Sequence, residues 1–341
     1  MDRSAKGGGS RTDTGVWVAG VDVGGTGVRI ALARLGPDGR PRPAARTDLA
    51  VATRTGPGGV DAGALLDVLL PALDALLAGG GDRRGPGGVR ALALGATGMV
   101  ALGRDLAARL PGPLAARSGA CRLVLASDAV CAYAGALGAG PGVVVAAGTG
   151  LVALGTGPAG GWRRADGWGH LLGDCGGGAW IGRAALDAAL RWHDGRDGGS
   201  AALLARAAGR YGPPEGWPAV FQGPDRAALL AGLAPEVAAA AAADPAAAAV
   251  LDRAADEIAG TAAAVAAGAA ARRIALTGRL FELPGLRDAV AARLTRRLPD
   301  VLLPAPDGDP LLGALRLAAA AARGNLPWPE QPPLLRVLAC T

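Results

Sequence analysis

The same local pattern occurs twice in this chain, as VWVAGVDVGGTGVRIALARL at residues 16–35 and as GVVVAAGTGLVALGTG at residues 142–157. Each copy has an apolar run, then a turn of glycine and threonine, then a second apolar run. Apolar runs of this length between glycines are typical of buried β-strands. Because only a short turn joins the two runs, we expect each copy to form an antiparallel pair of strands.

Further strands and helices follow each copy in a similar order. After the first copy the pattern predicts strand, helix, strand, helix and strand, at residues 46–51, 60–78, 89–98, 103–110 and 121–128. After the second copy it predicts a strand near residue 162, helices between 179 and 271, strands at 273–278 and 300–304, and a helix at 310–323. A repeat of roughly 120 residues is too long for a solenoid, so it indicates two similar α/β domains that face each other across a ligand-binding cleft.

The repeat also suggests where the domains begin and end. The first fifteen residues have no apolar periodicity, which predicts a disordered lead-in. We expect an N-terminal domain over 16–127, a C-terminal domain with a helical insertion over 128–325, and a tail over 326–341.

The composition argues against nucleic-acid binding and against membrane insertion. The formal net charge is +6, but Lys6 is the only lysine, the arginines are scattered, and 3% of residues are aromatic. Nucleic-acid binding favours a basic cluster interleaved with aromatic side chains, which this sequence does not contain. The alanine-rich runs 237–250 and 258–271 are either broken by Asp244-Pro245 or too short to span a bilayer. With no signal peptide and no Cys-x-x-Cys pair, we expect a cytoplasmic protein with free thiols.

Both glycine turns are candidate phosphate-binding loops. They consist of Gly24, Gly25, Thr26 and Gly27 in the first copy and of Gly148, Thr149 and Gly150 in the second. Without a Cβ in the way, backbone N–H groups of such a turn can approach phosphate oxygens closely. A tight hairpin also needs glycine, so one turn alone would say little. Two turns at matching places in a repeat favour phosphate binding.

Two aspartates at strand ends each allow a functional and a structural interpretation. Asp22 ends the first strand beside the glycines, where it could hold Mg²⁺ through water or cap its own turn. Asp128 follows the last strand of the first domain and begins a helical segment. It could be the helix N-cap, or a general base that orients and deprotonates a hydroxyl group.

A third glycine-rich segment, DGWGHLLGDCGGGAWIG at residues 166–182, is compatible with several sites. A metal site would need more ligands than His170 and Cys175. A thiol nucleophile would need a base beside Cys175, and the other histidine, His193, lies in a predicted loop. A third phosphate loop at 176–178, which leads into a predicted helix start, stays open beside a substrate-binding turn.

Several motifs together resemble one family. They are DVGGTGVRIAL, ASDAVCAYAGAL, VVVAAGTG and, as the most specific, GWGHLLGDCGGGAWIGRAAL. From Val16 to about Ala322 the chain resembles the N-acetylglucosamine kinase group of the BadF/BadG/BcrA/BcrD ATPase family. That group lies within the superfamily of actin, sugar kinases and heat-shock chaperones. The resemblance implies two duplicated ribonuclease H-like domains of the actin-like ATPase fold.

The same resemblance implies a reaction and its residues. It implies an ATP-dependent kinase, with Mg²⁺, that phosphorylates the 6-hydroxyl of an amino sugar such as N-acetylglucosamine, and it is compatible with a homodimer. Asp128 matches the general base and Asp22 the aspartate associated with Mg²⁺. Both glycine turns match phosphate-binding turns, and Gly278 matches the adenosine-binding turn. Trp168, Gly169 and Asp174 match the sugar pocket.

The chain also departs from the family pattern. It has Leu151 where serine usually follows the second phosphate turn, and Cys175 and Gly177 where glutamate and serine are usual. Arg279 replaces the second glycine of the adenosine-binding turn, and residues 52–61 lack the usual asparagine. These losses fall mainly on substrate contacts, so a regulatory relative that binds sugar or nucleotide without catalysis is the alternative.

Overall fold

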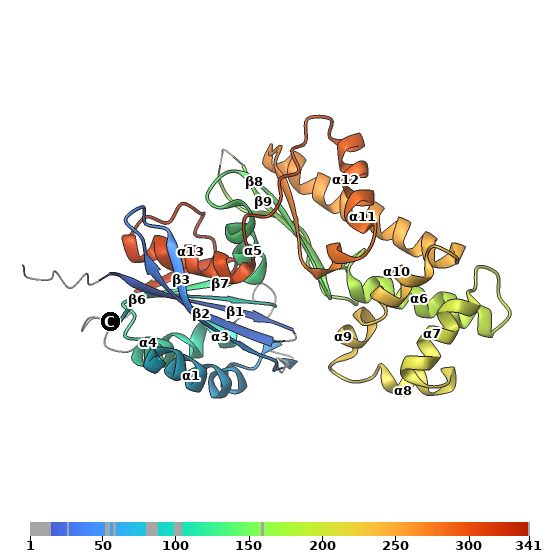
Figure 1. Ribbon diagram of the computed structural model, residues 1–341, viewed down its shortest axis with the longest axis horizontal. Coiled ribbons are helices and arrows are strands. Elements are labelled where there is room, and N and C mark those ends of the chain that lie inside the picture. The colour runs from blue at the N-terminus through green and yellow to red at the C-terminus, as the bar shows by residue number, and fades with distance from the viewer. Residues whose placement is uncertain are drawn as a thin grey trace, which may run out of the picture.

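The computed structural model describes residues 15–25, 27–51, 55–56, 59–79, 88–98, 104–157 and 160–339. These residues form two α/β bodies, each built on one main sheet (Figure 1). Residues 1–14 of the expected fifteen-residue lead-in lie outside the described residues, as does Thr26 of the first glycine turn.

The sheet of the N-terminal body has six strands in the order β12-β7-β6-β1-β2-β3. Their bounds are Trp17–Gly24 for β1, Gly27–Leu35 for β2, Pro41–Leu49 for β3, Val89–Ala96 for β6, Arg122–Ser127 for β7 and Leu335–Ala339 for β12. β1 pairs antiparallel with β2 and parallel with β6, which confirms the predicted hairpin of the first copy. A separate small hairpin consists of β4 (Thr55–Gly56) and β5 (Gly59–Val60).

Helices cover both faces of this sheet, and this explains why its central strands are apolar throughout. On one face, α1 (Ala62–Gly79), α3 (Arg104–Arg109) and α4 (Pro111–Ser118) share a core with β1, β2 and β6. On the other face lie α5 (Asp128–Leu137) and α13 (Pro310–Arg323). Neighbouring residues of β1 therefore enter different cores: Val18 contributes to the second and Ala19 to the first.

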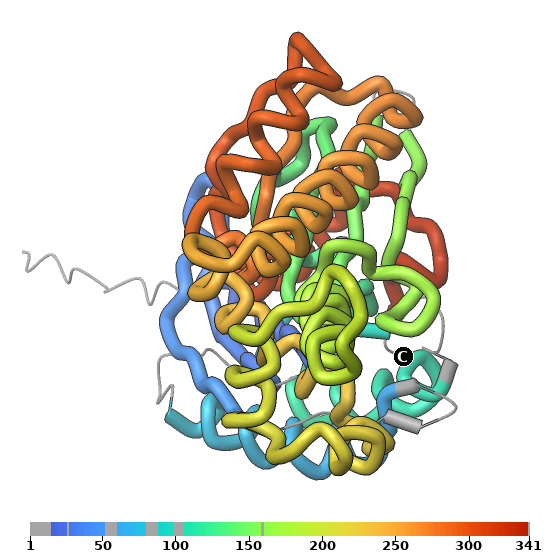
Figure 2. Tube along the Cα trace, turned by 90° about the vertical axis from the view of Figure 1, so that its right-hand side faces the viewer, coloured from blue at the N-terminus to red at the C-terminus, as the bar shows by residue number. Residues whose placement is uncertain are grey.

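The C-terminal body has a four-stranded sheet in the order β10-β9-β8-β11. Its longest helix, α11 (Pro245–Ala269), is the long orange helix in Figure 2. Its strands are β8 (Gly142–Ala147), β9 (Leu151–Thr156), β10 (Arg163–Asp166) and β11 (Ile274–Thr277). Its helices are α6 (Gly178–His193), α7 (Ala201–Tyr211), η2 (Pro214–Gly216), α8 (Trp217–Val220), α9 (Arg226–Ala231), α10 (Ala234–Ala240), α11 (Pro245–Ala269), η3 (Arg279–Glu282) and α12 (Leu286–Arg297). The antiparallel pair of β8 and β9 confirms the second copy of the pattern.

One predicted strand in the C-terminal part was wrong. The apolar run 300–304 forms no extended strand, because only an isolated bridge from Leu302 to Arg273 joins it to the sheet. The helix predicted at 310–323 exists, but it packs on β1 and β6 of the N-terminal body. The expected tail likewise supplies β12, which pairs with β7. The chain thus returns to its first sheet after completing the second.

One described helix, α1, is long and apolar enough to cross a membrane by length and composition. The segment from α9 to α10 passes the same test only together with α11, across a bend of 117°. In α1, Leu65, Leu69 and Leu73 are buried in the core beneath the sheet, and Pro71 lies inside the helix. Its apolar face is therefore used within the protein.

Two helices approach each other closely where α13 crosses α5. A Cβ placed on Gly313 would lie 1.8 Å from the carbonyl oxygen of Cys131, and one on Gly135 would lie 2.1 Å from that of Asp309. Arg316 of α13 also donates to the carbonyl oxygens of Ala134 and Gly135, at 2.9 and 2.8 Å. Both crossing positions require glycine, because backbone cannot move aside as a flexible side chain can.

We expect Gly313→Ala to lower the free energy of unfolding by about 2–4 kcal/mol, since overpacking against backbone forces the two helices apart. Urea denaturation followed by circular dichroism would measure the change. The matched control is Gly209→Ala in α7, where an added Cβ meets nothing within 4 Å. That control should stabilise the helix by up to about 1 kcal/mol. Equal stability of Gly313→Ala and wild type would contradict this account of the crossing.

Candidate active site

Three polar side chains meet at one edge of the first sheet. β1, β6 and β7 are parallel, with Val23 opposite Ala96 and Ala96 opposite Ser127. The carboxyl ends of these strands therefore lie side by side, as in other open α/β sheets. This edge carries Asp22 in β1, Thr97 directly after β6 and Asp128 directly after β7.

Asp128 is not the N-cap of α5. The cap is Ser127, whose hydroxyl oxygen accepts a hydrogen bond from the backbone N–H of Val130 at 3.2 Å. The Asp128 carboxylate instead accepts from the N–H of Ala129 at 2.8 Å and from the side chain of Thr97. Ser127 thus fills the N-cap position, and Asp128 is the first residue of α5.

The surroundings of Asp128 raise the pKa of its carboxyl group from 3.8 to about 6. Burial is the main cause, and the negative charges of Asp22 and Asp174 add to it. The hydrogen bonds from Ala129 and Thr97 act in the opposite direction. A carboxylate whose pKa lies this near neutrality accepts a proton more readily than an ordinary aspartate.

Asp22 is buried and paired with Arg29 of β2. The Arg29 Nε donates to Asp22 Oδ2 at 2.8 Å, and a second guanidinium N–H donates to the same oxygen. Arg29 also reaches Asp309, the N-cap of α13, at 3.0 Å. Burial raises the pKa of Asp22, and the Arg29 charge opposes this rise. Oδ1 of Asp22 accepts no hydrogen bond from the described part of the chain.

The glycines of the two turns fall into two classes. A Cβ on Gly27 would lie 2.8 Å from the carbonyl oxygen of Leu49, and one on Gly150 would lie 2.2 Å from Asp174 Oδ2. Packing therefore requires glycine at these two positions. A Cβ on Gly25 or Gly148 would meet nothing within 4 Å, and neither residue has a left-handed φ. At Gly25 and Gly148 the fold does not require glycine, but a ligand that approaches the backbone would.

Gly278 lies beside the second of these turns. It follows β11, which pairs parallel with β8, and the next residue after β8 is Gly148. Its φ is 105°, and an added Cβ would lie 2.1 Å from the carbonyl oxygen of Ala147. The structure thus brings the predicted adenosine turn and the second phosphate turn to the same edge of the second sheet. Arg279 begins η3 directly after Gly278.

The start of α6 is packed against the second turn. The N–H of Gly178 donates to the carbonyl oxygen of Gly148, and that of Ala179 to the carbonyl oxygen of Thr149, each at 2.9 Å. A third phosphate loop at 176–178 would need these first amides of the helix to be free. They are used within the protein, which contradicts that alternative.

Asp166 and Asp174 organise the loop between β10 and α6. Asp166 accepts hydrogen bonds from the backbone N–H groups of Asp174 and, at 2.9 Å, Cys175. Asp174 accepts from the N–H of Gly169 at 3.0 Å and from that of Leu151. Burial is the main cause that raises the pKa of Asp174. Asp174 thus joins the loop to β9, and a carboxylate with two such bonds still has lone pairs for a ligand.

Trp168, Cys175 and His170 occupy different environments in this loop. Trp168 is 65% exposed, so its ring is available to a ligand. Burial raises the pKa of the Cys175 thiol, which disfavours the thiolate that a nucleophile needs. His170 Nε2 is buried without a hydrogen-bond partner among the described residues. Across all the residues that the structure describes, no group of three or more His, Cys, Asp or Glu side chains is arranged to hold a metal ion.

The structure shows what surrounds three of the residues that depart from the family pattern. The Leu151 side chain is buried in the core of the second body. A Cβ on Gly177 would lie 2.8 Å from the backbone carbon of Gly150, so the packing of the turn against α6 leaves little room for serine. Cys175 keeps its backbone bond to Asp166, so the loop does not depend on the side chain at position 175.

Sequence reasoning missed Thr97, Arg29 and Asp166. Thr97 follows a buried strand in the sequence ATG, much as Asp22 and Asp128 end theirs, and this position was the available signal. Arg29 and Asp166 act through partners on other segments, which a local pattern does not reveal.

We expect Asp128→Asn to stabilise the fold at pH 7.5. The raised pKa means that the folded state favours the neutral carboxyl group, so stability falls as pH rises through about 6. Replacing the charge by an amide should recover stability on the order of 2 kcal/mol at pH 7.5, and less at pH 5. Urea denaturation at the two pH values would measure this. Asp67→Asn, at an exposed position of α1, makes the same chemical change and should have little effect. A variant less stable than wild type at pH 7.5 would contradict the account.

Comparisons with known proteins agree with this architecture. A family model for the BadF/BadG/BcrA/BcrD ATPase family matches residues 19–318. Among solved structures, a Chromobacterium violaceum protein assigned as an N-acetylglucosamine kinase is 31% identical, with a TM-score of 0.72 over 89% of this chain and 98% of that one. A Porphyromonas gingivalis protein with the same assignment is 17% identical, with a TM-score of 0.68 over 88% and 97% of the two chains.

A curated relative matches over a shorter stretch. The N-acetylmuramic acid/N-acetylglucosamine kinase of Clostridium acetobutylicum is 39% identical over 75 residues. These residues make up 22% of this chain and 24% of that kinase.

Proposed function

The chain belongs to the BadF/BadG/BcrA/BcrD ATPase family, and from this premise we propose that it is an ATP-dependent kinase that phosphorylates the 6-hydroxyl of an amino sugar. The proposal rests on the environment of Asp128. Ser127, not Asp128, is the N-cap of α5, and burial raises the pKa of the Asp128 carboxyl group to about 6. N-acetylglucosamine or a close relative is the expected acceptor, because the similar proteins carry names of that kind.

The residues present fit ATP and Mg²⁺. Gly25 and Gly148 leave open space where a Cβ would stand, so their backbone can approach phosphate oxygens. Thr26, Thr149 and the remaining glycines of the two turns would complete the phosphate contacts, with Gly278 on the adenosine side. Asp22 keeps one carboxylate oxygen free of Arg29 and would hold Mg²⁺ through water. Bound there, Mg²⁺ supplies positive charge that offsets the charge of the phosphates.

In the proposed reaction, the sugar 6-hydroxyl oxygen bonds to the γ-phosphorus as the bond to ADP breaks. Asp128 accepts the proton that the hydroxyl loses. Asp174, Gly169 and Trp168 would hold the sugar, with hydroxyl groups donating to the Asp174 lone pairs that Gly169 and Leu151 leave free. The transition state of phosphoryl transfer is loose, so positioning of the acceptor accounts for much of the rate.

We expect the activity of this kinase to depend on an ionised Asp128. The value of kcat/KM should fall as pH drops below about 6, because the protonated carboxyl group cannot accept a proton. Asp128→Asn should lower kcat by about 10²–10⁴-fold and leave ATP affinity nearly unchanged. A coupled ADP-release assay with N-acetylglucosamine, glucosamine, N-acetylmannosamine, N-acetylmuramic acid and glucose tests this. Wild-type turnover by Asp128→Asn would sink the assignment of the base.

The second candidate function is sugar or nucleotide binding without catalysis. The replacement of family residues by Leu151, Cys175 and Gly177 is the observation that favours it. The same assay separates the two functions. A ligand-induced rise in melting temperature without ADP release from any sugar would support the binding protein.

Gly148 offers a direct test of the phosphate turn. Because a Cβ there meets no protein atom within 4 Å, Gly148→Ala should leave the melting temperature unchanged. It should raise the KM for ATP by about 10-fold if phosphate oxygens approach this backbone. Gly216→Ala in η2 is equally open and lies in the helical insertion, so it is the matched control. An unchanged KM for ATP in Gly148→Ala would argue against the turn.

A further inference from the structure

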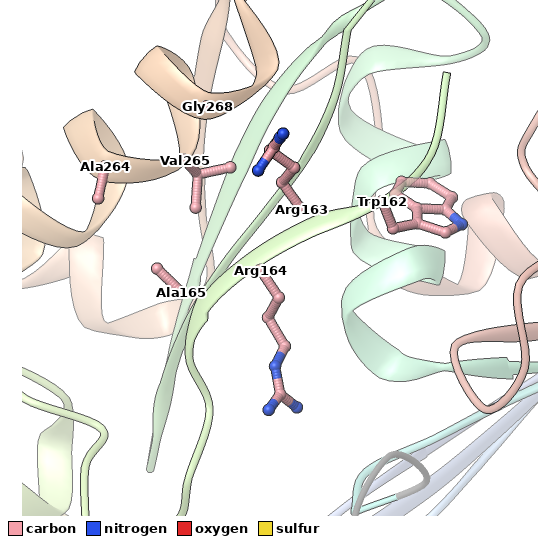
Figure 3. A pocket seen from close by; sticks show the side chains of 7 residues that line it. All are labelled: Trp162, Arg163, Arg164, Ala165, Ala264, Val265 and Gly268. Atoms are coloured by element: carbon pink, nitrogen blue, oxygen red, sulfur yellow. The ribbon is translucent and has the colours of Figure 1, made fainter. Parts of the chain in front are cut away.

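Two adjacent arginines of β10 have different surroundings. β10 is an edge strand, so successive side chains leave it on opposite faces. Both arginines line a groove of about 320 Å³ between β10 and α11, and the Arg163 side chain lies against Gly268. Arg164 leaves the strand in the opposite direction (Figure 3).

Arg164 lies over the ring of Trp168 in the loop that would bind the sugar. The guanidinium carbon is 4.4 Å from the ring centroid. Burial raises the pKa of Asp174, and the positive charge of Arg164 opposes part of this rise, which places the cation near the proposed sugar contact. Trp168, one proposed sugar-binding residue, thus stacks against Arg164, and the charge of Arg164 acts on Asp174, another.

The N–H groups of Arg164 have no acceptor in the described part of the chain. No hydrogen bond or ion pair there involves its guanidinium group, in contrast to Arg29, which has two carboxylate partners. The nearby Asp166 is already used by the backbone of the loop. Stacking on Trp168 uses the flat face of the guanidinium and leaves its N–H edge available.

Other positive charges surround the same loop. The Arg226 charge adds to burial in lowering the pKa of His170, and the Arg183 charge lowers that of Cys175 against the effect of burial. Neither Arg183 nor Arg226 has an ion-pair partner among the described residues. Asp166, Asp174 and Glu257 place negative charges beside the same loop. An anionic ligand would therefore need direct contact with one of these cations, because the charges around the loop are mixed.

We propose that Arg164 is a specificity-determining residue that binds a carboxylate carried by the sugar, so that the preferred substrate is an acidic amino sugar. A carboxylate matches the paired N–H groups of a guanidinium, which a single hydroxyl group does not. The inference rests on the proposed function, because it takes Trp168 and Asp174 as sugar contacts. It deepens that function by naming the chemical class of the substrate.

Isothermal titration calorimetry with two sugars tests this preference without requiring turnover. N-acetylmuramic acid is N-acetylglucosamine with a lactyl ether that carries a carboxylate, so the pair differs by the group in question. The wild-type protein should bind N-acetylmuramic acid about 10-fold or more tightly than N-acetylglucosamine. Arg164→Ala should remove this preference while it leaves the affinity for N-acetylglucosamine within about 3-fold, and Arg164→Lys should keep part of it.

Arg163→Ala is the matched control, because it removes the same charge from a side chain that leaves β10 in the other direction. It should keep the preference of the wild type. Equal affinity of the wild type for both sugars, binding of neither sugar, or an equal loss for both in Arg164→Ala would each overturn the proposal. An Arg164→Ala variant with altered ATP affinity and unchanged sugar preference would assign the arginine to phosphate and also overturn it.

The kinase proposal fails separately, in the ADP-release assay. A carboxylate preference that depends on Arg164, without ADP release from either sugar, would leave a binding protein for acidic sugars. Phosphorylation of both sugars without a preference would support the kinase proposal and contradict the proposed role of Arg164.

Discussion

The crossing of α5 and α13 fixes where the candidate site can form. Backbone contacts at Gly135 and Gly313 leave no space between the two helices. α5 begins with Asp128, and α13 begins after Asp309, which shares Arg29 with Asp22. Both helices belong to a core that also contains residues of both sheets. The distance between the base and the first phosphate turn therefore depends on how closely these helices pack.

The three acidic side chains of the candidate site are accommodated in three ways. Asp22 forms an ion pair with Arg29, and Asp174 accepts hydrogen bonds from backbone N–H groups. Asp128 has hydrogen bonds but no cation partner among the described residues, so most of the cost of burial appears as its raised pKa. A carboxylate that is buried without a cation weakens the fold, and such positions are candidates for function. This difference in partners, more than position in the chain, distinguishes Asp128 from the other two.

The sequence predicted the elements that local pattern determines and missed those that depend on distant contacts. The glycine turns and their strands are local, so both hairpins were predicted correctly. Residues 300–304 have the composition of a strand, but hydrogen-bonded neighbours decide whether a strand forms. The sequence could not choose between Ser127 and Asp128 as cap, because both residue types cap helices. Arg164 resembled any scattered arginine until the structure placed it over Trp168.

The family departures at Cys175 and Gly177 leave the backbone of the substrate loop intact. Asp166 and Asp174 hold this loop through main-chain N–H groups, which every residue except proline provides. Replacing the side chain at position 175 therefore changes what faces a ligand without removing the bonds that shape the loop. The N–H of Gly177 likewise donates to the carbonyl oxygen of Asp174, but its packing against the backbone of Gly150 favours glycine at this position. A loop built in this way can change its sugar specificity while the base and the phosphate turns stay in place.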